Sequence, residues 1–392
     1  MKKLTIVGRG TAGVQGALHF NRHLDKSKFE MEWLFDDSIP TQSVGEGSTL
    51  QMPRLMHETS GFGYRHLPKL GGCVKLGIKK SGWGSGKEFT HDFAQGGVGY
   101  HFQAALLHKY GLDYLKDRIH INDEHVGSTD DIDSDFVFDC SGRPKSFNDD
   151  FLKSDAIAVN AAKVWQCTWD EPKFNYTLAL ARPYGWVFGI PLSDRLSLGY
   201  IYNKDYATPE QIEDDMQEVF KLYDIDAPSK NNYIEFDSYW RNENFNERVG
   251  YSGNASFFLE PLEATSTATM DVCNRNMFDI VTGSKDIEYA NKNYTEALSQ
   301  AEDMIMLHYA AGSQWDTDFW RYAKDRGERK LAEAKDNTVF KKVLKESLRM
   351  AKAGTHITEF KKEYAFWGVE SFAKHITKLD LMDKVNSVVN GE

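Results

Sequence analysis

A glycine-rich loop near the amino terminus combines residue types and spacing that could bind phosphate. Gly8, Gly10 and Gly13 follow a short apolar run and precede a segment with helical spacing. Gly8 would permit a tight turn, Gly10 would let a pyrophosphate approach the backbone, and Gly13 would let the helix pack closely on the strand. Unpaired N–H groups at the start of the helix would bind the phosphates. The loop, which also contains Thr11 and Ala12, therefore predicts a dinucleotide-binding site.

Acidic and glycine residues at the ends of two further predicted strands extend this site. The second predicted strand ends at Asp36, which would bind the ribose hydroxyls, with Asp37 as the next candidate. Residues 135–142 read D-F-V-F-D-C-S-G, in which Asp139 and Gly142 resemble the strand and turn that flavin monooxygenases place beside FAD. The two motifs in this order favour FAD over NAD. The alternative interpretations are a glycine turn without a ligand and an ordinary strand-to-turn transition.

A lysine and a glutamate lie in two segments with more specific sequences. Residues 258–266 read F-L-E-P-L-E-A-T-S, and residues 74–79 read V-K-L-G-I-K. They closely resemble the F-x-E-P-L-E-S-T-G segment and the catalytic-lysine segment of flavin-dependent halogenases of the tryptophan-halogenase type. The resemblance implies that Lys75 and Glu263 are catalytic, because they occupy the matching positions.

Other segments match the same family in the same order along the chain. The match after Lys75 continues into Trp83, His91 and Phe93, and residues 307–309 and 316–320 resemble the family's L-H-Y and D-T-P-F-W pair. The resemblance assigns Gly45 and Glu46 to a strap over the flavin, and Gly253 to the cofactor site as well. It assigns the wall between flavin and substrate to Trp186, Phe188, Ile190 and Pro191.

The chain departs from the family pattern at three positions. Phe188 replaces a tryptophan of the wall, Ala264 replaces a serine, and Ser266 replaces a glycine. The resemblance implies that backbone N–H groups of Thr265 and Ser266 bind the halide at a helix start. A serine with a positive φ would be strained there, whereas a glycine would not.

The family chemistry implies a role for each side chain. In the family, reduced FAD, O₂ and a halide yield hypohalous acid, which reaches a lysine beside an electron-rich aromatic ring. Lys75 would hold this acid by a hydrogen bond or carry the halogen as a haloamine, because burial can lower the pKa of an ammonium group. Glu263 would polarise the halogen species or take the proton from the ring. The alternatives are a surface lysine and a helix-start carboxylate, and we interpret His91 and His101 as structural.

Composition excludes several classes of protein. The length of 392 residues suits two closely packed lobes, and the net charge of −11 argues against a nucleic-acid binder. The apolar run after the first residues is too short for a signal peptide or a membrane span. The cysteines are scattered along the chain, at Cys73, Cys140, Cys167 and Cys273. Their spacing predicts a cytoplasmic protein with neither a disulfide framework nor a metal site.

We expect an α/β protein with an FAD-binding Rossmann-like fold of the flavin monooxygenase type, a substrate sheet and a helical C-terminal cap. Residues 1–150 and 245–285 would form a discontinuous FAD-binding domain. Residues 151–244 would form the substrate-side sheet and helices, because their apolar residues alternate as in antiparallel strands. Residues 286–392 have helical spacing and would form the cap.

The resemblance predicts a halogenase for an electron-rich aromatic substrate. No nicotinamide site is evident, so a separate flavin reductase would supply FADH₂. The alternatives are an FAD-dependent aromatic hydroxylase and a flavin-binding protein without turnover. The chain is shorter than the tryptophan-specific members, which predicts a more open pocket and poor use of free tryptophan. The choice among chloride, bromide and iodide stays open, as does assembly into a homo-oligomer.

Overall fold

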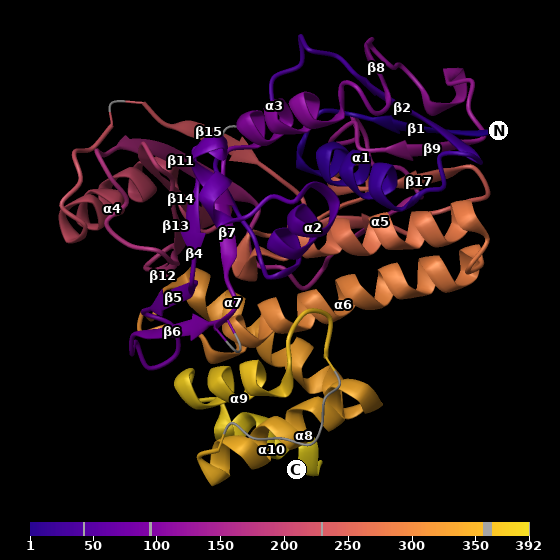
Figure 1. Ribbon diagram of the computed structural model, residues 1–392. Helices are drawn as coiled ribbons and strands as arrows, with labels where there is room; N and C mark the ends of the chain where they lie inside the picture. Colours follow the sequence, from indigo (N-terminus) through magenta and orange to yellow (C-terminus); the bar gives the residue numbers. More distant parts are fainter. Residues whose placement is uncertain (42–43, 94–95, 229, 356–362, 392) are drawn as a thin grey trace.

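The structure is a computed structural model that describes residues 1–41, 44–93, 96–228, 230–355 and 363–391. It has an α/β architecture in which a parallel sheet, a larger mixed sheet and a bundle of C-terminal helices lie around a shared core (Figure 1). Within the described ranges, no helix has the length and apolar character needed to cross a membrane.

A parallel five-stranded sheet forms the N-terminal part of the molecule. Its first strand is buried from Leu4 to Val7, as expected for a parallel strand covered on both faces. Helix α1 (Thr11–His23) packs against α2 (Gln51–Ser60), α3 (Ala104–Leu115) and α5 (Ser266–Thr282). In sheet order the strands are β17 (Val249–Tyr251), β9 (Phe136–Asp139), β1 (Lys2–Val7), β2 (Phe29–Phe35) and β8 (His120–Asp123).

The strand register brings several predicted cofactor residues to one edge of this sheet. Val7 at the end of β1 pairs with Asp139 at the end of β9, and Asp139 pairs with Tyr251 at the end of β17. The loops that follow these ends contain Gly8, Gly142 and Gly253. Open α/β sheets bind their ligands at the carboxyl ends of the strands.

A small sheet connects this edge to the predicted catalytic lysine. Strand β7 (Gly99–Phe102) pairs on one side with β3 (Glu46–Gly47) and on the other with β4 (Cys73–Lys75). The predicted flavin strap and Lys75 are therefore two strands apart in one sheet.

The middle of the chain forms a seven-stranded mixed sheet. One face packs on α4 (Pro209–Leu222), and the other faces the main core. Strands from the expected unit 1–150 also join this sheet, so that unit supplies strands to more than one layer. In sheet order the strands are β15 (Asn232–Glu235), β11 (Ala161–Thr168), β14 (Arg195–Tyr202), β13 (Gly185–Pro191), β12 (Thr177–Arg182), β5 (Gly77–Ser81) and β6 (Phe89–Asp92). A separate three-stranded sheet consists of β10 (Phe151–Lys153), β16 (Tyr239–Arg241) and β18 (Phe257–Phe258).

The C-terminal region is helical, as the sequence predicts. The long helix α6 (Ile287–Ala311) packs on α5 and on α7 (Asp318–Ala332). Helices α8 (Thr338–Ala353), α9 (Val369–Lys378) and α10 (Met382–Asn390) lie at the bottom of Figure 1, and α9 packs against β6. Short 3₁₀ helices are η1 (Tyr64–Leu70), η3 (Thr129–Asp131), η4 (Gly253–Ala255), η5 (Leu262–Ala264) and η6 (Glu333–Lys335).

The contact between α1 and β1 leads to a stability prediction. A β-carbon at Gly13 would lie 2.0 Å from the carbonyl oxygen of Gly8, which is backbone and cannot move aside. Gly13→Ala should therefore lower the free energy of unfolding by about 3 kcal/mol in a urea titration. Gly10→Ala is the matched control, because a β-carbon there would meet no atom within 4 Å. Equal stability of the two variants would contradict this packing.

Candidate active site

The glycine loop has the steric features that a bound pyrophosphate needs. Gly8 has a φ of +106°, and a β-carbon there would lie 2.2 Å from the carbonyl oxygen of Cys140. A β-carbon at Gly10 would instead meet no atom within 4 Å. Helix α1 starts without a side-chain cap and without an acid in its first turn, so its N–H groups are available to an anion.

The residues around this loop fit the FAD that the sequence implies. The Nε atom of Arg9 is buried without a hydrogen-bond partner in the described residues. A β-carbon at Gly142 would meet no atom within 4 Å, which leaves space beside the loop. Asp36 accepts hydrogen bonds from the backbone N–H of Ser38, at 2.9 Å, and from Nδ1 of His125, at 3.0 Å. The loop therefore offers donors and space for a dinucleotide, with Asp36 held at its edge.

The strap contacts the start of α1. The hydroxyl of Thr11 donates a hydrogen bond to the carboxylate of Glu46, and burial raises the pKa of Glu46 to about 7. Gly45, the preceding residue, has a φ of +90°. On the other side of the loop, Gly253 approaches Ala12 so closely that a β-carbon would lie 2.8 Å from the Ala12 side chain. The predicted cofactor residues thus come together at the helix start.

Lys75 lies beside the strap in a buried site. A β-carbon at Gly47 would lie 3.5 Å from Nζ of Lys75, and the ring centre of Phe93 is 5.7 Å from that atom. The side chain is fully buried, and its Nζ atom has no hydrogen-bond partner within the part of the chain that the structure describes. Burial lowers the pKa of Lys75 to about 7, with Glu263 acting against the shift and Lys80 adding to it. An unprotonated amine is therefore available near neutral pH.

Glu263 has an unusual backbone conformation. It lies in η5 with a φ of 67°, and Ala264 follows with a φ of 55°. Left-handed conformations cost non-glycine residues about 1–2 kcal/mol each, so this turn is held by its surroundings. Ser266, where a positive φ would cause strain, is instead the first residue of α5.

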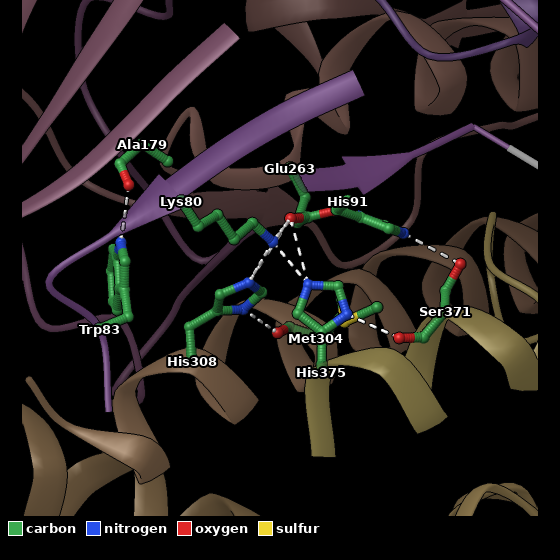
Figure 2. Close-up of polar contacts among 9 residues, drawn as sticks. All are labelled: Lys80, Trp83, His91, Ala179, Glu263, Met304, His308, Ser371 and His375. Atoms are coloured by element: carbon green, nitrogen blue, oxygen red, sulfur yellow. Dashed lines mark hydrogen bonds and ion pairs between the residues drawn. The ribbon is translucent and has the colours of Figure 1, made fainter. Parts of the chain in front are cut away.

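The carboxylate of Glu263 is enclosed by cationic and imidazole groups (Figure 2). Its Oε1 accepts a hydrogen bond from Nζ of Lys80, and its Oε2 accepts one from Nδ1 of His91 at 3.0 Å. Burial alone would raise the pKa of Glu263, but Lys80 and His91 outweigh burial and hold this pKa well below its usual value. The carboxylate is therefore ionised, and its nearest cation is Lys80.

Lys80 has three hydrogen-bond acceptors around one ammonium group. Besides Glu263, its Nζ lies 2.6 Å from Nε2 of His308 and 2.5 Å from Nε2 of His375. The Nδ1 atoms of these histidines donate to backbone carbonyls of their own helices, at Met304 (2.9 Å) and Ser371 (2.7 Å). Both imidazoles therefore present a lone pair to Lys80, and burial lowers the pKa of each, which keeps them neutral.

The same cluster has donor atoms at a spacing that a metal ion could bridge. Atoms of His91, Glu263 and His375 lie within 4.8 Å of one another. The ammonium group of Lys80 already lies between the carboxylate and the imidazole of His375. A metal ion would have to displace this ammonium, so we assign no metal to the cluster.

The predicted wall residues pack in the main core, where Ile190 also lies close to Gly45 of the strap. Trp186, Phe188 and Ile190 point to one face of β13, and the ring of Phe188 covers Gly199 of the neighbouring strand. Glu260 holds this wall: it accepts hydrogen bonds from Nε1 of Trp186, at 2.9 Å, and from the hydroxyl of Tyr309, at 2.8 Å. Burial raises the pKa of Glu260 to about 7. The buried Pro191 ends the strand.

The start of α5 offers a site for an anion. Thr265 is its N-cap residue, and neither a side-chain cap nor an acid in the first turn occupies the N–H groups that begin at Ser266. The hydroxyl oxygens of Thr265 and Thr267 are buried and lack hydrogen-bond partners among the described residues. These donors lie directly after Glu263 in the chain.

Several residues of this site were absent from the sequence prediction. Lys80 falls one residue beyond the recognised lysine segment, and His375 lies in a helix with no recognised motif. The alternation in β5 was a usable signal for Lys80, because it shares the buried face with Ile78 and a buried lysine needs a partner. The sequence predicts a structural role for His91, whereas its Nδ1 atom contacts Glu263 directly. Helix α9 covers the Lys80 side of the cluster through His375, and the expected open pocket beside Lys75 stays a prediction.

Comparison with known proteins agrees with the resemblance. A sequence model of the family described as tryptophan halogenase matches residues 3–130 and 114–381. The tryptophan 6-halogenase SttH of Streptomyces toxytricini is 27% identical over 262 residues, which cover 58% of this chain and 49% of that protein. The tryptophan 7-halogenase RebH of Lentzea aerocolonigenes is 25% identical over 258 residues, covering 58% and 48%. The matched segment thus spans about half the length of these curated relatives.

Solved structures show the same fold over nearly the whole chain. The flavin-dependent halogenase Xcc4156 from Xanthomonas campestris superposes with a TM-score of 0.79 at 17% identity, covering 100% of this chain and 94% of that one. The flavin-dependent halogenase BrvH from Brevundimonas sp. BAL3 gives a TM-score of 0.78 at 17% identity, covering 100% and 96%. This likeness confirms the fold class expected from the sequence.

The strained turn at Glu263 leads to a second stability prediction. Ala264→Gly should raise the free energy of unfolding by about 1 kcal/mol, because glycine adopts a positive φ without strain. The control Ala297→Gly, inside α6, should lower it by about 1 kcal/mol, because glycine is unfavourable within a helix. Urea unfolding measures both variants. A similar loss of stability in both would show that the turn is unstrained.

Proposed function

Because the chain belongs to the tryptophan halogenase family, we propose that it is a flavin-dependent halogenase that acts on an electron-rich aromatic ring through Lys75. The observation that carries this proposal is a buried lysine without a hydrogen-bond partner among the described residues, beside the flavin strap and an ionised glutamate. A surface lysine would have neither the environment nor the neighbours for this chemistry.

The cofactor proposed for the glycine loop is FAD. Gly8, Gly10 and Gly13 would receive its pyrophosphate at the start of α1, with the ribose near Asp36 and the strap at Glu46. Reduced FAD, when bound, would supply the two electrons that activate O₂, so that O₂ can oxidise the halide to hypohalous acid. A separate flavin reductase would deliver the reduced cofactor. Backbone N–H groups of Thr265 and Ser266 would bind the halide.

The amine of Lys75 would receive the halogen. Its unprotonated nitrogen can attack the halogen atom (X) of hypohalous acid. An N–X bond forms, the O–X bond breaks, and the hydroxide that leaves takes one proton from the amine to become water. Alternatively, the amine holds the acid by a hydrogen bond and orients it. Both routes need an amine that burial has kept from permanent protonation, and the pKa of about 7 for Lys75 satisfies this requirement.

The roles of Glu263 and the wall follow from their positions. After the aromatic ring attacks the halogen, the ring cation must lose a proton, and the carboxylate of Glu263 would accept it. The lowered pKa of Glu263 makes its carboxylate a weak base. The ring cation is a very strong acid, so the proton transfer to this carboxylate is still favourable. Trp186 and Phe188 would separate the flavin from the substrate and so prevent direct hydroxylation of the ring.

The cofactor assignment is tested at Gly10. In Gly10→Val, the added side chain points into open space and should leave stability within about 1 kcal/mol of the unmodified protein. It should nevertheless lower the affinity for FAD at least about tenfold, because the pyrophosphate could no longer approach the backbone. Fluorescence titration with FAD measures the affinity. Unchanged affinity would place the cofactor elsewhere.

The halogenation step is tested at Lys75. Lys75→Ala should oxidise reduced FAD at the normal rate but halogenate an aromatic substrate at least about a hundredfold more slowly. Lys79→Ala is the matched control, because Lys79 pairs with Glu88 at 2.8 Å and lies partly exposed in β5, on the face opposite Ile78 and Lys80. Normal halogenation by Lys75→Ala would refute the assignment. Hydroxylated products formed without halide would favour the aromatic hydroxylase, and flavin binding without any product would favour a non-catalytic protein.

A further inference from the structure

Two buried lysines lie near one buried carboxylate, but their surroundings differ. Lys75 and Lys80 are both fully shielded from solvent, and both interact electrostatically with Glu263. The Nζ atom of Lys75 has no hydrogen-bond partner in the described part of the chain. The Nζ atom of Lys80 has three acceptors. The two amines are therefore built for different protonation states.

The acceptors around Lys80 match the three N–H groups of an ammonium ion. One is the Oε1 of Glu263, and the others are lone pairs of His308 and His375. Each histidine is locked in the required tautomer by a carbonyl of its own helix. A neutral amine could donate only two hydrogen bonds, so this arrangement selects the charged form of Lys80.

We propose that Lys80 is a positioning residue: its ammonium group neutralises and orients Glu263, so that Glu263 does not form an ion pair with Lys75. The inference rests on the proposed function, because it assigns the two lysines separate tasks within one halogenation site. Burial lowers the pKa of Lys80, but Glu263 acts against this shift, so Lys80 supplies the positive charge. Lys75 supplies the unprotonated amine that receives the halogen.

This division follows from the electrostatics of a buried carboxylate. An ionised carboxylate in the interior needs a cation, and besides Lys80 the amine of Lys75 also interacts electrostatically with Glu263. Pairing with Glu263 would protonate Lys75 and remove its nucleophilic lone pair. The titratable groups facing the two amines are Glu263 in η5, His91 on β6, His101 on β7, His308 on α6, and Lys374 and His375 on α9.

The test measures each amine without relying on enzyme turnover. Isocyanic acid, present in cyanate solutions, adds only to unprotonated amines: the amine nitrogen bonds to carbon, and its proton moves to the cyanate nitrogen. Peptide mass spectrometry of the folded protein after cyanate treatment, over a series of pH values, reports the midpoint for each lysine. Because this readout needs neither flavin nor substrate, a protein without halogenase activity would refute the proposed function and leave this test intact.

In the unmodified protein, carbamylation of Lys75 should have its midpoint near pH 7, and Lys80 should remain unmodified there. In Lys80→Met, the midpoint for Lys75 should rise by about one pH unit or more, because Glu263 becomes its partner. Lys80→Met/Glu263→Gln removes both charges, so it should fold even if Lys80→Met does not, and its midpoint should return toward that of the unmodified protein. Lys163→Met, which removes a buried lysine paired with Glu213 elsewhere, should leave the midpoint unchanged.

Three results would overturn the proposal. One is a midpoint for Lys75 that does not move in Lys80→Met, because a purely structural role would reduce stability without shifting the titration. Another is a raised midpoint that persists in Lys80→Met/Glu263→Gln. The third is carbamylation of Lys80 in preference to Lys75 in the unmodified protein, which would make Lys80 the reactive amine.

Discussion

The burial of one carboxylate, that of Glu263, sets the conditions for the rest of the site. Removing an ionised carboxylate from water costs several kcal/mol unless cations and hydrogen-bond donors replace the solvent. Here the replacement comes from Lys80 and His91, which donate to the two carboxylate oxygens. Lys80 in turn requires His308 and His375, so four separate elements must assemble around Glu263: β5, β6, α6 and α9. The C-terminal helices are therefore part of the site as well as its cover.

The fold brings this cluster and the cofactor loop together through short connections. The parallel sheet collects the loops after β1, β9 and β17 at one edge, where α1 begins. The sheet of β3, β7 and β4 places the strap two strands away from Lys75. Strand β5 begins shortly after Lys75 and contains Lys80. The left-handed turn at Glu263 and Ala264, which its surroundings hold in place, directs the carboxylate toward Lys80 and His91. A proposed hypohalous acid would thus travel between elements that belong to one connected core.

Motifs with their own local structure could be predicted from the sequence. The strand–glycine–helix pattern and β2 follow from apolar periodicity, and β12 to β14 follow from a sequence pattern typical of antiparallel strands. The strands from β3 to β7 are short and rich in glycine and polar residues, so their pairing depends on distant partners that no local pattern shows. The same limit applied to Lys80 and His375: they are 295 positions apart, and only the packing of α9 on β6 makes them neighbours. Glu260 was within a recognised motif, but its role depends on Trp186 and Tyr309 from other elements.

The most direct test of the central claim is mass spectrometry of an aromatic substrate after incubation with the protein, reduced FAD, O₂ and bromide. A panel of indoles, phenols, pyrroles and free tryptophan covers the electron-rich rings that such a site could accept. We predict a product with the paired isotope pattern of bromine, which disappears when bromide, reduced FAD or the amine of Lys75 is removed. A product that gains only oxygen, in the same yield with or without halide, would contradict the claim.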